Sequence, residues 1–227
     1  MKAIKLKQIL MPFLCMVIFS CDDDDVNYYT NNVAYGTLVN ASPNSGELFM
    51  YADDNIINQN ALNYTDVRGY YNFYTGDRVF YLRDQQGHTL DSLAVSLNDY
   101  DQFSLFAVNT FDEISIEKYD DNVSYPGAGK AKVRFINLSP DAPKITITVN
   151  NNILGEELQF KNASSYFSFD KGTYSLKIIN SGSGEVLYED ANVDWYGGRI
   201  YTIYTKGYVT PPSGSNDIFS TQTIVNF

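Results

Sequence analysis

The stretch Ile136-Asn137-Leu138-Ser139-Pro140 decides the fold, because a near copy, Val39-Asn40-Ala41-Ser42-Pro43, stands 97 residues earlier. The similarity continues along both copies at an offset that changes by only one residue in either direction. Further matched segments are Leu48–Tyr51 with Ile145–Thr148, Gly69–Phe73 with Ser165–Phe169, and Phe103–Phe106 with Tyr201–Tyr204. A near-constant offset over this length predicts a tandem duplication of a module of roughly 95 residues.

Each copy reads as a series of short strands. Ile145–Val149 and Tyr174–Ile178 alternate apolar and polar residues, whereas Val79–Leu82 and Ile200–Tyr204 are rich in strand formers without clean alternation, as in strands covered on both faces. Turn formers such as Asn150–Asn152 separate the runs. We therefore expect an all-β fold of two tandem Ig-like antiparallel β-sandwich domains, with about seven strands in each.

The first twenty residues read as a signal peptide. Three lysines precede the apolar run Ile9–Phe19, which at eleven residues is too short to span a membrane, since a spanning helix needs roughly 20. Ser20-Cys21 then resembles the cleavage site of a bacterial lipoprotein signal, with Cys21 as the lipidated residue. The next four residues, Asp22, Asp23, Asp24 and Asp25, resemble the export tag of surface lipoproteins in Bacteroidetes-type bacteria.

The cysteine count fits this interpretation. The chain has two cysteines, and Cys15 would be removed with the signal, so that Cys21 would remain alone. A lone exported cysteine needs an explanation, and acylation supplies one. The expected location is therefore the outer membrane, lipid-anchored, at the cell surface. The alternative location is the periplasmic leaflet of the outer membrane. The alternative interpretation of the N-terminal segment is an ordinary secretory signal with a chance cysteine.

The charge of the chain restricts its partners. The net charge is −11, and removal of residues 1–20 would leave 13 basic against 27 acidic residues, a net charge of −14. Such a chain repels phosphates, so nucleic acid is not an expected partner. It also lacks a basic patch for anionic lipid, so the membrane would be reached through the covalent anchor.

Two segments carry a family resemblance. Arg134–Pro143 resembles the opening strand and turn of the DUF4397 family, and Gly198–Tyr204 is similar to its closing strand. The resemblance implies a β-sandwich fold and export, and it implies no catalytic residues. The expected organisation is a signal peptide at 1–20, an acidic lipid-anchored tether at 21–32, and sandwiches at 33–124 and 130–227.

The repeated Asn-x-Ser-Pro element has a structural interpretation. Proline lacks an N–H group, so Pro43 and Pro140 are expected to end a strand and begin a turn. Asn and Ser side chains can bond the backbone groups that the turn leaves free. We expect these residues to hold the turn rather than a ligand.

The sequence offers little for catalysis. His88 is the single histidine and lies in an expected hairpin tip, while neither a mature cysteine pair nor a phosphate-binding glycine loop is present. Acidic residues are plentiful, but their spacing singles out neither a catalytic pair nor a calcium loop. We therefore predict no catalytic residues, no metal site and no cofactor.

Aromatic residues are the better candidates for ligand contact, because exposed flat rings stack on sugars or anchor protein partners. The alternative is that they pack between the two domains or under loops. The candidates are Tyr70, Tyr71, Phe73, Tyr74, Trp195 and Tyr196.

These observations favour a non-enzymatic, membrane-anchored envelope lipoprotein that serves as a binding or structural module of the cell surface, with an envelope protein or a glycan as its possible partner. The alternative is a glycan-binding protein that uses exposed aromatics, and a third hypothesis is a carboxylate-based glycosidase.

The tether up to about Thr30 could extend at most about 35 Å. Recognition is therefore expected on the second copy, which would stand further from the membrane.

Overall fold

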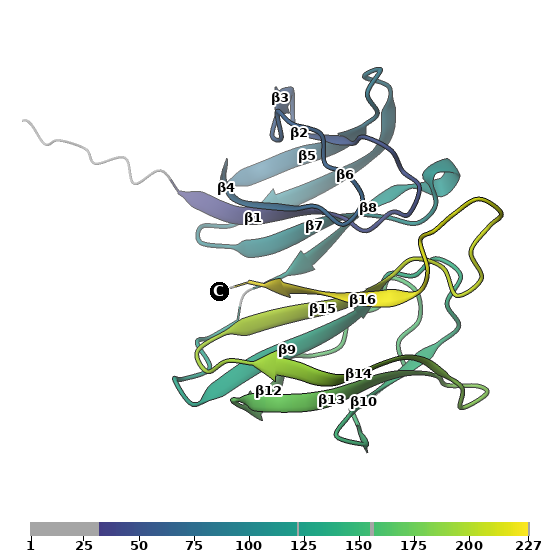
Figure 1. Ribbon diagram of the computed structural model, residues 1–227. Coiled ribbons are helices and arrows are strands. Elements are labelled where there is room, and N and C mark those ends of the chain that lie inside the picture. Colours follow the sequence, from purple (N-terminus) through teal and green to yellow (C-terminus); the bar gives the residue numbers. More distant parts are fainter. Residues whose placement is uncertain (1–31, 122, 155–156, 227) are drawn as a thin grey trace, which may run out of the picture. The chain divides into compact units, whose positions relative to one another are not determined.

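The computed structural model describes residues 32–121, 123–154 and 157–226, which belong to one compact unit (Figure 1). The predicted signal peptide, Cys21 and the run Asp22–Asp25 lie outside the described residues. Within the described ranges, no helix has the length and apolar character needed to cross a membrane.

The first copy, residues 33–120, forms two four-stranded sheets, with strand orders β4-β1-β7-β8 and β3-β2-β5-β6. Its elements are β1 (Val33–Asn40), β2 (Phe49–Ala52), β3 (Asn55–Ile56), β4 (Val67–Tyr74), β5 (Gly76–Arg83), β6 (Thr89–Leu97), β7 (Gln102–Val108), the 3-10 helix η1 (Phe111–Glu113) and β8 (Ser115–Asp120).

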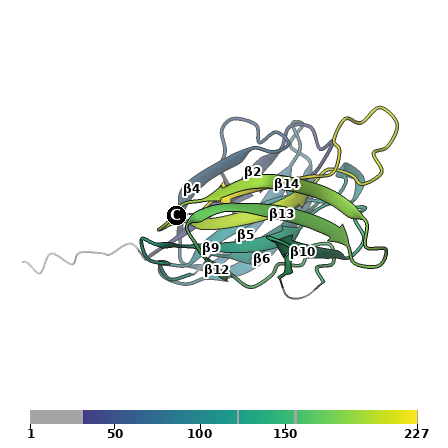
Figure 2. The ribbon, with the colours of Figure 1, turned by 60° about the horizontal axis from the view of Figure 1, so that its bottom comes forward.

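The second copy, residues 130–225, repeats this topology, with strand orders β12-β9-β15-β16 and β11-β10-β13-β14. Its strands are β9 (Lys130–Asn137), β10 (Ile145–Val149), β11 (Asn152–Ile153), β12 (Phe167–Asp170), β13 (Gly172–Asn180), β14 (Val186–Trp195), β15 (Ile200–Lys206) and β16 (Ser220–Val225). Strands β13 and β14 pair antiparallel and are the two long green ribbons that lie side by side in Figure 2.

The all-β sandwich prediction is confirmed, with two corrections of detail. Each described copy has eight strands rather than about seven, because a two-residue strand follows the second strand in both. The pairing is also not wholly antiparallel, since β1 runs parallel to β7 and β9 runs parallel to β15. In each copy the chain passes twice through the opposite sheet. It returns first as an antiparallel neighbour of the opening strand (β4, β12) and then as its parallel neighbour on the other side (β7, β15).

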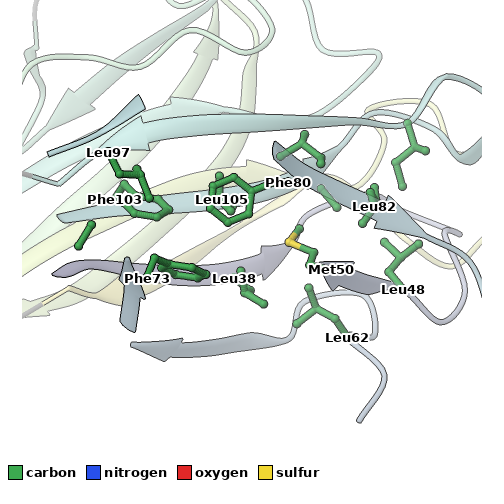
Figure 3. Packing of buried hydrophobic residues seen from close by; sticks show 14 residues of the cluster. Leu38, Leu48, Met50, Leu62, Phe73, Phe80, Leu82, Leu97, Phe103 and Leu105 are labelled. Atoms are coloured by element: carbon green, nitrogen blue, oxygen red, sulfur yellow. The ribbon is translucent and has the colours of Figure 1, made fainter. Parts of the chain in front are cut away.

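The core of the first sandwich lies between its two sheets (Figure 3). The Phe73 ring lies 5.3 Å from that of Phe80 and 5.5 Å from that of Phe103, measured between centroids. Position 36 on β1 requires glycine, because a Cβ on Gly36 would lie 2.7 Å from the rings of Phe73 and Phe103. The core therefore depends on one glycine as well as on its large side chains.

The second sandwich has a core of the same kind with a different centre. Trp195 is 1% exposed, and its ring lies 4.5 Å from that of Tyr174 in a stacked arrangement and 4.4 Å from that of Phe169. In the first sandwich Leu97 holds the position of Trp195, since Leu97 pairs with Gly76 as Trp195 pairs with Gly172.

The structural interpretation of the Asn-x-Ser-Pro element is confirmed in both copies. Asn40 donates to the Leu62 carbonyl oxygen at 3.0 Å and accepts from the backbone N–H of Ser42 at 3.0 Å. In the second copy, Asn137 donates to the Leu158 carbonyl oxygen at 3.2 Å.

The serines of the element make matching contacts. Ser42 donates to the carbonyl oxygen of Asn109 at 2.6 Å, and Ser139 donates to that of Gly207 at 2.7 Å. Both acceptor residues have positive φ, 75° and 73° respectively. The element thus ties the end of the first strand to the turn that follows the seventh.

Candidate functional site

The most elaborate buried site among the described residues lies where the two copies meet. Eight buried apolar side chains form this interface core: Val39, Ala41, Phe106, Val108, Ile136, Leu138, Tyr204 and Ile224. The rings of Phe106 and Tyr204 meet edge to face, with centroids 5.4 Å apart.

The two copies use equivalent positions for this contact. Val39 pairs with Phe106 across β1 and β7, and Ile136 pairs with Tyr204 in the same way across β9 and β15. The same face of each sandwich is therefore turned toward the other, as in the self-complementary interface of a symmetric dimer.

A buried ion pair crosses the same interface. Asp121, which follows β8, is fully buried and is bonded to Arg134 of β9, which is 3% exposed. The Asp121 carboxylate also accepts from Ser104 at 2.6 Å and from Asn226 at 3.2 Å. Arg134 donates to the hydroxyl of Thr202 at 3.0 Å and to the carbonyl oxygen of Asp120 at 2.7 Å.

Two tyrosines adjoin this ion pair. The guanidinium carbon of Arg134 lies 5.1 Å from the centroid of the Tyr166 ring. Burial raises the pKa of Tyr166 to about 12, and Arg134 partly opposes the shift. Burial and the charge of Asp121 raise the pKa of Tyr70, which holds the position equivalent to Tyr166. Both phenols therefore stay neutral near pH 7.

The buried ion pair of Asp121 and Arg134, with its hydrogen-bond partners Ser104, Thr202 and Asn226, holds the two copies together, and we call it the clamp. Burial raises the pKa of Asp121, while Arg134 and the hydrogen bonds from Ser104 and Asn226 oppose the shift. A carboxylate that already holds three partners has little capacity left for a substrate. The cluster thus joins residues from both copies.

The loop between β15 and β16 adds a second contact between the copies (yellow in Figure 1). Asp217 in this loop accepts from the backbone N–H of Asn44 at 3.1 Å. Gln222 on β16 donates to the carbonyl oxygen of Thr65 at 2.8 Å. The contact between the copies therefore extends beyond the apolar interface core.

Sequence reasoning did not identify the clamp. The available signal was Arg134, a charged residue within the otherwise apolar run Val133–Ile136. Its partner Asp121 was not identifiable, because it is one acid among many in a segment that reads as a loop.

Three of the six candidate aromatics were expected to be exposed for ligand contact, but the structure packs them against other side chains. Trp195 and Phe73 belong to the two sandwich cores, because their strands turn these side chains inward. They border the two grooves described below but are only 1% and 6% exposed. Tyr70 is half-buried beside Asp121 and Arg134 at the contact between the copies. Packing, the alternative interpretation, holds for these three residues.

The remaining three lie at grooves. Tyr71 is half-buried, and Tyr74 is 67% exposed on the same strand, β4. Both line a groove of about 430 Å³ between β4 and the β2–β3 hairpin, which we call the Tyr74 groove. Tyr196, also 67% exposed, lines a groove of about 340 Å³ beside Thr173 and Asp194.

The residues with potential for catalysis are dispersed. His88 is largely exposed, and its Nδ1 atom lies 2.9 Å from Asp84 in the β5–β6 hairpin. Within the described ranges, no three side chains among His, Cys, Asp and Glu are grouped to hold a metal. Each of the two grooves has one carboxylate among its described lining residues, Asp53 and Asp194 respectively. Most glycosidases use a pair of carboxyl groups, one on each side of the scissile bond.

Two similar sandwiches joined through equivalent faces define a tandem β-sandwich protein. The chain belongs to the DUF4397 family, since the family model described as "Domain of unknown function (DUF4397)" matches residues 34–148 and 135–218. A comparison with curated proteins found no match.

Among solved structures, the chain is similar to the tip fimbrial protein Mfa3 from Porphyromonas gingivalis with C-terminal truncation. The identity is 10%, the TM-score is 0.25, and the alignment covers 86% of this chain and 99% of that one. A likeness this weak supports no argument about function.

Proposed function

We propose that the chain is a non-enzymatic lipoprotein of the cell envelope, anchored through Cys21, whose two fused sandwiches act as a binding or structural module. The observation that carries the proposal is the buried clamp between the copies. The most buried charges among the described residues, Asp121 and Arg134, are used to join the sandwiches.

The anchor rests on the sequence of the N-terminal segment. Ser20-Cys21 provides the cleavage site, and Asp22–Asp25 provides the signal for export to the outer face of the outer membrane. Two or three acyl chains on Cys21 would hold the protein firmly, because a single chain gives only reversible binding. The periplasmic leaflet is the alternative location.

Mass spectrometry of the mature protein tests the anchor. We expect an N-terminal Cys21 carrying acyl chains, and we expect Cys21→Ser to release the protein from the membrane fraction, because the thiol that takes the lipid is gone. Cys15→Ser is the matched control and should leave the anchor in place. An unmodified N-terminus at another residue would contradict the proposal.

Protease treatment of whole cells tests the side of the membrane. The protein should be degraded on intact cells, and conversion of Asp22–Asp25 to asparagines should protect it, because the charged tag is lost while the anchor remains. If the parent protein and the asparagine variant are equally protected on intact cells, the module lies in the periplasm.

Glycan binding is the second candidate function. The observation that favours it is the Tyr74 groove, which is lined by Tyr71 and by the exposed Tyr74, two of the predicted aromatics. It is tested by the binding experiment given below.

A further inference from the structure

We propose that the Tyr74 groove is a binding site for a sugar ring of a neutral glycan. This inference rests on the second candidate function, and it places recognition on the first sandwich rather than on the second. The groove volume of about 430 Å³ falls within the usual range of small-ligand sites, roughly 300–1,000 Å³.

The walls of the groove combine flat apolar surface with polar groups. Tyr74 and Ile56 are exposed, at 67% and 41%, while the half-buried Tyr71 packs against the core at the inner side of the groove. Asn55 and Asn72 supply amide donors and acceptors. A sugar ring needs this combination, because its C–H face packs on an aromatic ring while its hydroxyl groups need hydrogen-bond partners.

The charged wall of the groove is fixed in place. The Arg78 guanidinium donates to the carbonyl oxygens of Tyr74 at 3.0 Å and Thr75 at 2.9 Å. Asp53 accepts from the backbone N–H of Val79 at 3.0 Å, and its second oxygen lies 3.5 Å from Arg78. A site whose polar groups are already held loses less entropy when a ligand binds.

The second sandwich indicates which of these residues the fold itself requires. Tyr174 stands at the position of Arg78, and its hydroxyl donates to the carbonyl oxygen of Asp170 at 2.6 Å. Asp170 stands at the position of Tyr74. Both copies therefore use a side chain to bond the carbonyl before the β-turn, but only the first has a ring there. The exposed ring of Tyr74 is thus not needed for the fold.

The electrostatics of the groove favour a neutral ligand. Asp53 and Arg78 are the charged residues among the described lining, and they face each other. The chain as a whole carries a net charge of −11, which repels polyanions. Acidic polysaccharides are therefore disfavoured.

Isothermal titration calorimetry of the full chain, solubilised in detergent, tests the inference. The probes are neutral oligosaccharides derived from glucan, mannan, galactan and xylan, with oligogalacturonate as the acidic comparison. We expect at least one neutral oligosaccharide to bind and the acidic one not to bind. Tyr74→Ala should weaken the binding by about tenfold or more, because aromatic contacts carry a large share of binding energy.

Tyr100→Ala is the matched control, since this tyrosine is 66% exposed, lies between β6 and β7 of the first sandwich, and lines neither groove. It should leave the affinity unchanged, and both variants should keep the unfolding midpoint of the parent. Failure of every neutral oligosaccharide to bind, or binding that is insensitive to Tyr74→Ala, would overturn the inference. Neither result affects the anchor, which the acylation of Cys21 tests separately.

Discussion

Gly36 is the residue on which the packing of the first sandwich depends most directly. It lies on β1 directly beneath the rings of Phe73 and Phe103, so any side chain must displace an aromatic ring of the core. Packed cores resist such displacement because they have little free space.

We expect Gly36→Ala to lower the free energy of unfolding by about 1–3 kcal/mol, the usual cost of overpacking a core. Gly129→Ala is the matched control, because a Cβ added there would meet no atom within 4 Å and the φ of Gly129 is not in the left-handed region. Urea denaturation followed by circular dichroism measures both. Equal effects of the two substitutions would contradict this account of the core.

The Asn-x-Ser-Pro residues show how far sequence reasoning reaches at this scale. Their structural role was predictable, because proline ends a strand and short polar side chains bond nearby backbone groups. The acceptor of the serine was not predictable, since Asn109 and Gly207 lie more than sixty residues further along the chain.

The clamp between Asp121 and Arg134 connects the elements β8 and β9 across the interface. Removing one partner of a buried ion pair leaves the other charge without compensation, which typically costs about 3–5 kcal/mol. Replacing both partners by apolar groups is often nearly neutral.

We expect Arg134→Met to destabilise the protein by about 3–5 kcal/mol at pH 7, and the double variant Arg134→Met with Asp121→Leu to recover most of this loss. The loss should shrink as the pH is lowered toward 5. Burial already raises the folded pKa of Asp121, and removal of Arg134 raises it further, so the single variant is favoured below that pKa and loses stability as the pH rises through it.

Urea denaturation of the parent, the single variant and the double variant at pH 7 and pH 5 measures these effects. The loss in Arg134→Met is attributed to the unpaired charge of Asp121. A double variant that is as unstable as the single variant would contradict this attribution. A loss that grows as the pH falls would have the wrong sign for a carboxyl group with a raised pKa.

Strand patterns explain what could be predicted about the elements. The missing alternation in Ile200–Tyr204 indicated a strand covered on both faces, and these residues of β15 are all buried. The same pattern in Val79–Leu82 was misleading, because this part of β5 alternates between half-buried and buried residues. A half-buried tyrosine on an outer sheet face reads like a core residue in sequence.

At the scale of the molecule, the duplicated copies associate through equivalent faces. The interface core takes Val39 and Phe106 from the first copy and their counterparts Ile136 and Tyr204 from the second. The duplication was evident in the sequence, but the face through which the copies join was not. Apolar residues on β1 or β9 fit a sandwich core and an interface equally well.

The central claim is that the two copies unfold as one unit, because each covers an apolar face of the other. The single tryptophan of the chain, Trp195, is buried in the second sandwich and reports on that sandwich alone. Leu82 is buried in the first sandwich and makes no part of the interface core.

The most direct test is therefore urea unfolding of the Leu82→Ala variant followed by Trp195 fluorescence, with Leu176→Ala in the second sandwich as the positive control. Coupled copies predict that Leu82→Ala lowers the free energy of unfolding reported by Trp195 by about 2–5 kcal/mol, as a buried leucine truncation does elsewhere. An unchanged Trp195 transition, with an earlier loss of circular dichroism from the first sandwich, would show that the copies unfold independently and would contradict the claim.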